Sequence, residues 1–177
     1  MKFDLVTGVI EGAGVVKGKR TVSELAHLFR RSPESVSGEE VVYETYSLPE
    51  GQHPDALLAT TIIQPGTVGD EFFMTRGHFH LDERRGETTT VIAGRGVVVL
   101  ANRGGESRVI PVTSGDIVQI DGEWAHRLVN VGDSPLIFFV TWVADCGHDY
   151  ATIERDGFPV CIVRDDDGWK AVANDRT

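Results

Sequence analysis

Residues 75–80 read Thr-Arg-Gly-His-Phe-His and place two histidines two positions apart, at His78 and His80. In a β-strand successive side chains point to opposite faces, so the two imidazoles share one face and Phe79 lies on the other. Neutral imidazole is a good ligand for divalent transition metals. By itself, however, this spacing is more typical of a solvated or hydrogen-bonded histidine pair than of a metal site.

Features further along the chain favour the metal site. Glu87 follows the pair, a glycine turn and an apolar run occupy residues 94–100, and His126 lies in a separate strand-like segment. Three imidazoles and one carboxylate suit Fe, Mn, Ni, Zn or Co. We therefore expect His78, His80, Glu87 and His126 to bind one divalent transition metal ion per chain.

The composition is that of a soluble globular protein. The chain has 177 residues, 41% hydrophobic and 25% charged, with a formal net charge of −10. This acidic balance argues against nucleic acid or an anionic membrane surface as a partner, because both attract basic proteins. We find no apolar run of the ~18–20 residues needed to span a bilayer and no signal-peptide pattern. Cys146 and Cys161 are read as reduced thiols, and we expect a cytoplasmic protein.

Short runs of β-branched, aromatic and apolar residues recur from residue 41 onward. Glycine, proline, asparagine or aspartate separates them. The runs predict strands at residues 41–46, 57–64, 71–80, 88–93, 97–101, 108–112, 117–120, 127–130 and 136–143. Many short strands without intervening helices are typical of an all-β sandwich or barrel.

The two ends of the chain do not follow this pattern of short strands. Residues 1–19 are rich in glycine and predict an extended arm, and residues 21–31 predict a short helix that Pro33 ends. Near the C-terminus, residues 149–156 predict one or two helical turns closed by Gly157.

A strand at residues 160–163 and a hairpin turn at residues 165–168 are expected to follow. We expect one domain spanning residues 1–177. Its parts are an N-terminal arm and short helix (1–39), a barrel core (40–145) and a C-terminal extension (146–177).

The histidine-containing segments resemble the two motifs of the cupin superfamily. The first motif, His-x-His…Glu…Gly, is matched by the histidine pair, Glu87 and Gly94, and the second, Gly…His-x-x-x-Asn, by Gly115, His126 and Asn130. This resemblance implies a jelly-roll β-barrel with a ligand-holding interior. Cupins include enzymes, binding proteins and storage proteins, so the superfamily alone leaves the function open.

Longer segments resemble the cupin-type phosphoglucose isomerases over roughly residues 40–160. The matching segments lie at residues 65–72, 75–80, 124–132 and 144–150, the last reading Ala-Asp-Cys-Gly-His-Asp-Tyr. The six residues between His80 and Glu87 also suit this family. The resemblance implies a metal-dependent aldose–ketose isomerase that interconverts glucose 6-phosphate and fructose 6-phosphate.

The same resemblance implies roles for individual residues. Thr61, Thr75 and Gly77 would contact the sugar phosphate, through two hydroxyls and a backbone N–H without an arginine clamp. His148 and Tyr150 would line the sugar end of the site.

Glu87 is the candidate base for removing the C2 proton, and His148 is the candidate for ring opening or proton shuttling between oxygens. The alternative chemistry is a hydride shift between the two carbons, since a carboxylate engaged by a metal is a weakened base.

Two positions depart from the family pattern. Thr89 and Trp142 stand where tyrosine and another aromatic hydroxyl are expected, so two phenol donors are missing. Trp142 offers an indole N–H and a flat surface to a substrate, and Tyr43 or Tyr46 is a candidate replacement donor. These departures leave two alternatives: a non-catalytic sugar-phosphate-binding cupin and an iron-dependent cupin oxygenase.

We also expect a homodimer. Apolar residues of the arm, including Val9, Ile10, Val15 and Val16, would cover the barrel or exchange strands with a partner, because an exposed sheet edge needs cover.

Overall fold

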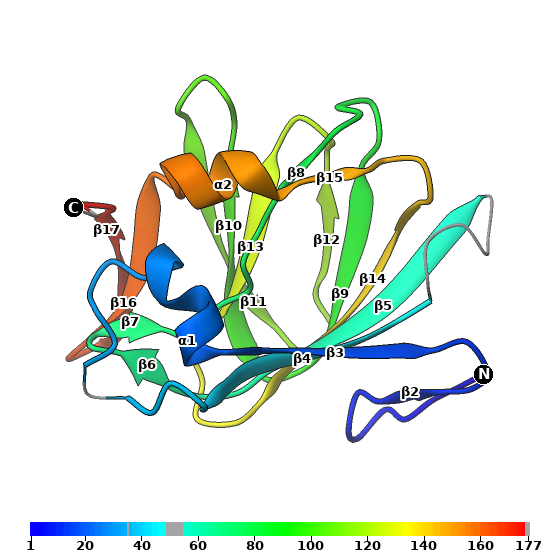
Figure 1. Cartoon of the computed structure of the whole chain (residues 1–177), viewed down its shortest axis with the longest axis horizontal. Helices are drawn as coiled ribbons and strands as arrows, with labels where there is room; N and C mark the ends of the chain where they lie inside the picture. The colour runs from blue at the N-terminus through cyan, green and yellow to red at the C-terminus, as the bar shows by residue number, and fades with distance from the viewer. Residues whose placement is uncertain (35, 49–54, 176–177) are drawn as a thin grey trace.

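Antiparallel strands dominate the computed structural model, which describes residues 1–34, 36–48 and 55–175 (Figure 1). The strands are β1 (Lys2–Phe3), β2 (Ile10–Glu11), β3 (Val16–Thr21), β4 (Val41–Ser47), β5 (Ala56–Ile63), β6 (Thr67–Val68), β7 (Glu71–Phe72), β8 (Phe79–His80), β9 (Glu87–Ala93), β10 (Arg95–Ala101), β11 (Ser107–Thr113), β12 (Ile117–Ile120), β13 (Ala125–Asn130), β14 (Leu136–Val143), β15 (His148–Asp149), β16 (Val160–Asp165) and β17 (Gly168–Ala173). The helices are α1 (Val22–Leu25), a 3-10 turn at Ala26–Leu28, and α2 (Tyr150–Asp156).

Two sheets form the barrel. The larger has the strand order β12-β9-β14-β5-β4-β3, and the smaller has the order β11-β10-β13. Residues from both sheets, such as Val91, Phe138, Val98 and Leu128, belong to one buried apolar core. The expected all-β jelly-roll barrel is confirmed.

The predicted strand at residues 71–80 is wrong as a continuous element. The structure divides it into β7 and β8, and only single bridges join Met74 to Val129 and His78 to His126 between them. Gly77 adopts a φ of +77°, in the left-handed region that favours glycine, so the extended backbone is interrupted at this point. The regular alternation of side chains is interrupted there too.

The predicted helix at residues 21–31 is correct at its start and too long at its end. Thr21 caps α1, and the Glu24 carboxylate accepts a bond from the backbone N–H of Thr21, as in a capping box. Phe29 is already extended, with φ −75° and ψ 148°. Next to it, the backbone N–H of Arg30 donates to the buried Glu71 carboxylate at 2.6 Å. This tertiary contact replaces another helical turn.

The N-terminal arm lies against the outer face of the larger sheet. Phe3 contacts Phe139 with ring centroids 5.5 Å apart, and the Thr60 hydroxyl donates to the Gly8 carbonyl at 2.6 Å. Side chains alternate along β5 and β14, so Thr60 and Phe139 face outward while their neighbours face the interior. The arm therefore covers the barrel of its own chain, which is one of the two arrangements expected from the sequence. Strand β3 forms the edge of the sheet beyond β4.

The C-terminal predictions are confirmed. Helix α2 covers most of the expected turns, Asp149 caps its start, and Gly157 ends it. Strands β16 and β17 form the expected hairpin, which joins β7 in a separate four-stranded sheet. In Figure 1, α2 crosses the upper part of the barrel, and the hairpin lies near the C-terminus. Cys146 and Cys161 are buried free thiols.

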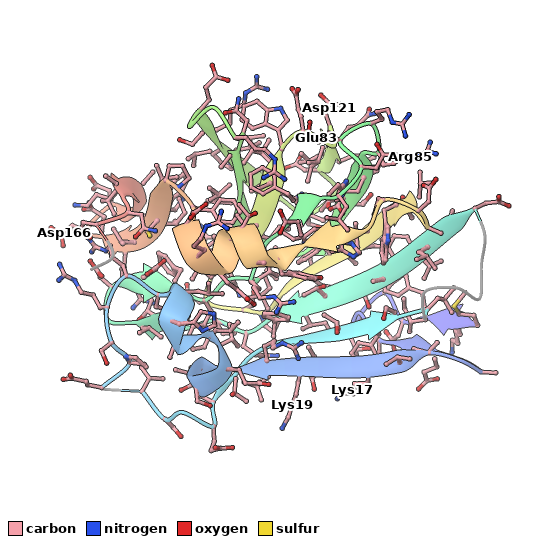
Figure 2. All side chains as sticks on the ribbon, turned by 45° about the horizontal axis from the view of Figure 1, so that its top comes forward. Lys17, Lys19, Glu83, Arg85, Asp121 and Asp166 are labelled. Carbon is pink, nitrogen blue, oxygen red and sulfur yellow. The ribbon has the colours of Figure 1, made fainter. Side chains whose placement is uncertain are left out.

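Charged side chains project from the outer surface (Figure 2). Lys17 and Lys19 extend from the edge strand β3, and Glu83 and Arg85 lie on the loop between β8 and β9. None of the helices within the described ranges combines the length and apolar character that a membrane crossing requires.

A prediction concerns the buried Asn130, which connects three parts of the barrel. Its Nδ2 donates to the carbonyls of Ile63 and Ser134, and its Oδ1 accepts from the N–H of Gly132, all at 2.9 Å. Asn130→Ala leaves these groups without partners, so we expect the free energy of unfolding to fall by about 3 kcal/mol in denaturant titrations.

The matched control is Asn102→Ala. Asn102 also makes three hydrogen bonds, to Gly104 and Glu106, but in an exposed loop where water replaces them. We expect a loss of about 1 kcal/mol or less. Equal losses in the two variants would contradict the assigned role of Asn130.

Candidate metal centre and adjoining cavity

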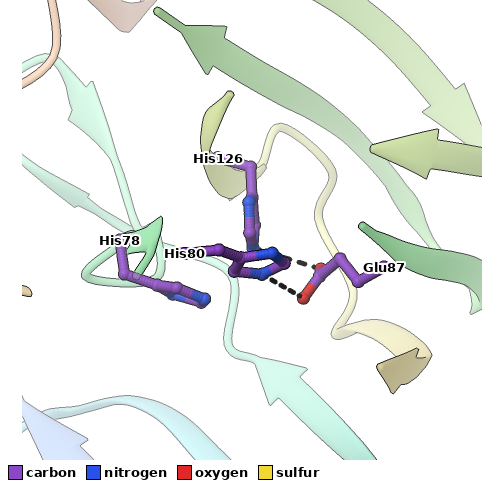
Figure 3. A group of neighbouring side chains, drawn as sticks. All are labelled: His78, His80, Glu87 and His126. Carbon is purple, nitrogen blue, oxygen red and sulfur yellow. Dashed lines mark ion pairs between the residues drawn. The ribbon is translucent and has the colours of Figure 1, made fainter. Parts of the chain in front are cut away.

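Four side chains from three segments of the chain converge inside the barrel (Figure 3). His78, His80, Glu87 and His126 place one ligand atom each within 4.8 Å of one another. His80 lies on β8, Glu87 begins β9 and His126 lies on β13, while His78 is joined to His126 by a backbone bridge. The sequence prediction that these four residues meet is thus matched by the structure.

Backbone carbonyls orient two of the imidazoles. His80 Nδ1 contacts the Arg85 carbonyl at 2.5 Å, and His126 Nδ1 lies 3.4 Å from the Trp124 carbonyl. With Nδ1 held in this way, Nε2 of each ring is directed toward the shared centre, as is usual for metal-binding histidines. The Nε2 atoms of His80 and His126 lie 3.6 and 3.1 Å from the Glu87 carboxylate.

Two buried nitrogen atoms of the cluster lack the partner that a metal ion would supply. Nε2 of His78 and Nε2 of His80 are buried, and neither has a hydrogen-bond partner among the described residues. Buried polar atoms rarely remain unpaired in folded proteins, and a divalent cation would supply the missing partner. The four residues could therefore hold a metal ion.

The electrostatics of two of the four residues, His78 and Glu87, favour their metal-binding protonation states, whereas at His126 the Glu87 carboxylate outweighs burial and raises the pKa. Burial, and next the neighbouring His126, lower the pKa of His78 well below its usual value, so this imidazole is neutral. Burial by itself would raise the pKa of Glu87, but the imidazoles of His126 and His80 outweigh it and hold that pKa below the usual range. Neutral imidazole and ionised carboxylate are the forms that bind metals.

A cavity of about 610 Å³ opens beside the cluster. Apart from His80, every residue that we assigned to the site from the sequence lines it: Thr61, Thr75, Gly77, His78, Glu87, His126, Trp142, His148 and Tyr150. His80 is fully buried behind the other ligands. The structure thus brings the predicted metal ligands and the predicted substrate contacts to one place.

Strand register brings four residues of the site together in two cross-strand pairs. His148 pairs with His80 across β15 and β8, and the His148 ring lies 4.4 Å from the ring of His78. Trp142 pairs with Glu87 across β14 and β9. The Trp142 indole N–H is buried without a hydrogen-bond partner among the described residues, so it is available to a ligand.

The backbone conformation and the close packing at position 77 both require glycine. A Cβ at this position would lie 2.6 Å from a ring carbon of Phe158 and 2.9 Å from the His126 carbonyl. Together with its positive φ, this leaves room only for glycine. The neighbouring Thr75 hydroxyl accepts from the Leu128 N–H at 3.1 Å, so its own hydrogen is free to be donated.

The structure decides two questions that the sequence left open. Thr89 is fully buried, and its hydroxyl lies 3.4 Å from Glu87, so it supports a metal ligand and does not face the cavity. Of the two candidate tyrosines, Tyr43 lines the cavity, whereas Tyr46 points to the other face of β4 beneath the Lys17 ammonium group.

Sequence reasoning missed three polar residues of the cavity wall: Thr45, Ser47 and Arg76. Thr45 lies opposite Thr61 across β4 and β5 and shares the inward face with Tyr43, an alternation that could have identified it. Arg76 also lines the cavity, although strand alternation between Thr75 and Gly77 predicts that it points away.

Comparisons with known proteins agree with this geometry. A family model described as glucose-6-phosphate isomerase matches residues 19–177. The glucose-6-phosphate isomerase of Pyrococcus horikoshii is 41% identical over 181 residues, which covers 99% of this chain and 95% of that protein. The enzyme of the same name from Thermococcus kodakarensis is 40% identical over 180 residues, covering 99% and 94%.

Among solved structures, the Lactobacillus farciminis oxalate decarboxylase formate complex aligns with a TM-score of 0.49 at 21% identity. The alignment covers 61% of this chain and 30% of that one.

Metal binding provides the prediction for this site. We expect the protein to bind about one Mn²⁺ or Zn²⁺ per chain in equilibrium dialysis, and at ~100-fold excess over Kd the ion should stabilise the fold by about 2.7 kcal/mol. His80→Ala removes a fully buried ligand and should lose most of this binding, because three side chains hold a divalent ion less tightly than four.

His27→Ala is the control, because His27 lies exposed on the 3-10 turn after α1. This variant should bind the ion as the wild type does. Equal binding by the His80 and His27 variants would show that the metal is held elsewhere.

Proposed function

Since this chain belongs to the cupin-type glucose-6-phosphate isomerase family, we propose that its cavity holds the open-chain phosphosugar with C1 and C2 beside His78, His80, Glu87 and His126. Members of this family are aldose–ketose isomerases that act on a phosphorylated sugar. The observation that supports the placement is the convergence of four candidate ligands, three of them buried, at the wall of a cavity that also contains hydroxyl and imidazole donors.

The four ligands hold one divalent transition metal ion, among Fe, Mn, Ni, Zn and Co. A bound ion supplies Lewis acidity toward the oxygens on C1 and C2. The chain's own contribution is to fix the ligands: the Thr89 hydroxyl supports Glu87, and the Arg85 carbonyl holds the His80 ring. Such supporting contacts orient metal ligands and set their basicity.

The phosphate end of the sugar lies against Thr61, Thr75 and Gly77. The Thr75 hydroxyl has its hydrogen to donate, and the backbone around Gly77 approaches the cavity without a side chain in the way. Hydroxyl and amide donors of this kind bind phosphate oxygens. The Trp142 indole N–H and the Tyr150 ring border the sugar chain.

His148 moves protons at the sugar oxygens. Its ring lies 4.4 Å from His78, 5.7 Å from Tyr150 and 6.1 Å from Trp142, between the metal ligands and the side chains that border the sugar. An imidazole in this place is suited to open the sugar ring and to carry a proton between O1 and O2, since one ring nitrogen can accept a proton and the other can donate one.

Glu87 is the candidate base for the C2 proton, and its contacts limit that role. His126, His80 and Thr89 all contact the carboxylate, which lowers its basicity. If Glu87 nonetheless removes the proton, the reaction passes through an enediol. The alternative is a hydride shift from one carbon to the other with no base at C2.

Three broader expectations stay predictions. We propose that residues 1–177 act as one domain and that two chains assemble as a homodimer, with nucleic acid not a partner. The arm covers its own barrel, so a dimer does not require arm exchange. The cytoplasmic location stays a prediction as well.

A metal-reconstitution assay tests the proposed function. The chelated protein is supplied with each divalent ion in turn, and glucose 6-phosphate formed from fructose 6-phosphate is measured with a coupled dehydrogenase. We expect at least one ion to restore turnover in the wild type, while His80→Ala stays inactive for want of a ligand. Tight sugar-phosphate binding without product under every ion would instead support the non-catalytic alternative.

His148→Ala separates proton transfer from metal binding. We expect kcat to fall about 100-fold, which is typical for loss of a general acid or base, while metal stoichiometry is unchanged. His27→Ala again serves as the control. A normal kcat in His148→Ala would remove this residue from the mechanism.

Isomerisation in D₂O distinguishes the two routes open to Glu87. An enediol route with Glu87 as base should exchange the transferred hydrogen with solvent, so mass spectrometry should find deuterium on carbon in the product. Product without deuterium would support the hydride shift and leave Glu87 as a ligand alone.

A further inference from the structure

Arg76 lines the cavity but has no role in the function proposed above. Among the described residues that line the cavity, it is the only lysine or arginine. It lies between Thr75 and Gly77, which we place at the phosphate end of the substrate. Its location therefore puts a permanent positive charge at that end.

The guanidinium group is held in place from one side. It stacks 3.6 Å from the centre of the Tyr150 ring, and its Nη1 lies 3.1 Å from the Glu154 carboxylate. Tyr150 and Glu154 are both on α2, so this helix fixes the direction of the arginine. A planar cation on an aromatic face is a favourable and well-defined arrangement.

The backbone of Arg76 is fixed as well. The buried Arg127 donates from Nη2 to the Arg76 carbonyl at 2.8 Å, and the Arg127 guanidinium lies 4.5 Å over the Phe158 ring. Phe158 is also the side chain that occupies the space beside Gly77. Arg76 is thus a preorganised residue, with both its main chain and its charged group positioned before any ligand arrives.

Most of the donors of Arg76 remain available. A guanidinium carries five N–H groups in a planar fork, and Glu154 accepts from only one of its nitrogens. The described residues offer the other nitrogens no hydrogen-bond partner, and the side chain is 24% exposed. This geometry matches the oxygens of a phosphate, which arginine binds in a bidentate manner.

The negative charge of the whole chain increases the effect that a local cation has on phosphate binding. The formal net charge is −10, so the protein repels a phosphate dianion at long range. The Thr61 and Thr75 hydroxyls and the Gly77 N–H are neutral donors, and charge-assisted hydrogen bonds are about twice as strong as neutral ones. A local positive charge would offset the repulsion and favour a phosphorylated ligand.

We propose that Arg76 binds the phosphate group of the substrate and determines the preference for phosphorylated over unphosphorylated sugars. This inference rests on the proposed function and adds a charged group to the phosphate site, for which the sequence predicted only neutral donors. Tyr150 and Glu154 orient Arg76, and Arg127 positions its backbone.

Arg76→Gln and Arg76→Lys test the proposal against Arg95→Gln. Arg95 is exposed at the start of β10 and does not line the cavity, so its variant loses the same charge elsewhere. We expect Arg76→Gln to raise KM for fructose 6-phosphate about tenfold or more with kcat changed less than about threefold. Arg76→Lys should keep part of the affinity, and Arg95→Gln should match the wild type.

Ligands that differ in charge make the test specific. Inorganic phosphate should inhibit the wild type competitively and should inhibit Arg76→Gln about tenfold more weakly. Turnover of unphosphorylated fructose, however slow, should be the same in both proteins. Metal stoichiometry and thermal unfolding check that each variant is folded.

The possible failures are distinguishable. If the wild type isomerises fructose 6-phosphate and Arg76→Gln keeps its KM and its inhibition by phosphate, the proposal for Arg76 is overturned while the proposed function stands. If the wild type does not turn over with any ion, the proposed function fails. Calorimetric titration of inorganic phosphate into wild type and Arg76→Gln then decides the role of Arg76, since equal affinities would overturn it.

Discussion

The structure depends on gathering three imidazoles and one carboxylate, three of these four groups buried, at a single point inside a β-barrel. Polar atoms removed from water destabilise a fold unless they find partners. Here Glu87 contacts His126, His80 and Thr89, and the carbonyls of Arg85 and Trp124 occupy the outward nitrogens of two rings. What remains unpaired is directed at one centre, the arrangement that a cation requires.

The cavity beside this centre is built in two different ways. Regular strands supply one wall, where alternation turns Tyr43, Thr45 and Thr61 inward from β4 and β5. Irregular segments supply the other: the stretch from β7 to β8 carries Thr75 and Arg76, and β15 leads directly into α2 with His148 and Tyr150. The regular wall gives rigidity, and the irregular wall brings in side chains that a flat sheet cannot present.

Much of the fold and site was predictable from local patterns. Short β-branched runs located most strands, and the capping residue Thr21 located the start of α1. The meeting of the four candidate ligands was predictable because His-x-His directs both rings to one side and the cupin motifs add Glu87 and His126. The predicted helix and the strand at residues 71–80 failed where a distant group intervened, as Glu71 does at Arg30 and as Phe158 and the His126 carbonyl do at Gly77.

The sequence by itself determined the all-β class, the convergence of the four candidate metal ligands and, through resemblance, the family and about half of the residues that line the cavity. Only the tertiary structure decided that His148 lies opposite His80, that Thr89 supports Glu87 and that Arg76 faces the cavity. The reason is physical: periodicity acts over neighbouring residues, whereas cross-strand register joins positions far apart in the chain. At Gly77 a positive φ also ends the periodicity on which the sequence prediction for Arg76 relied.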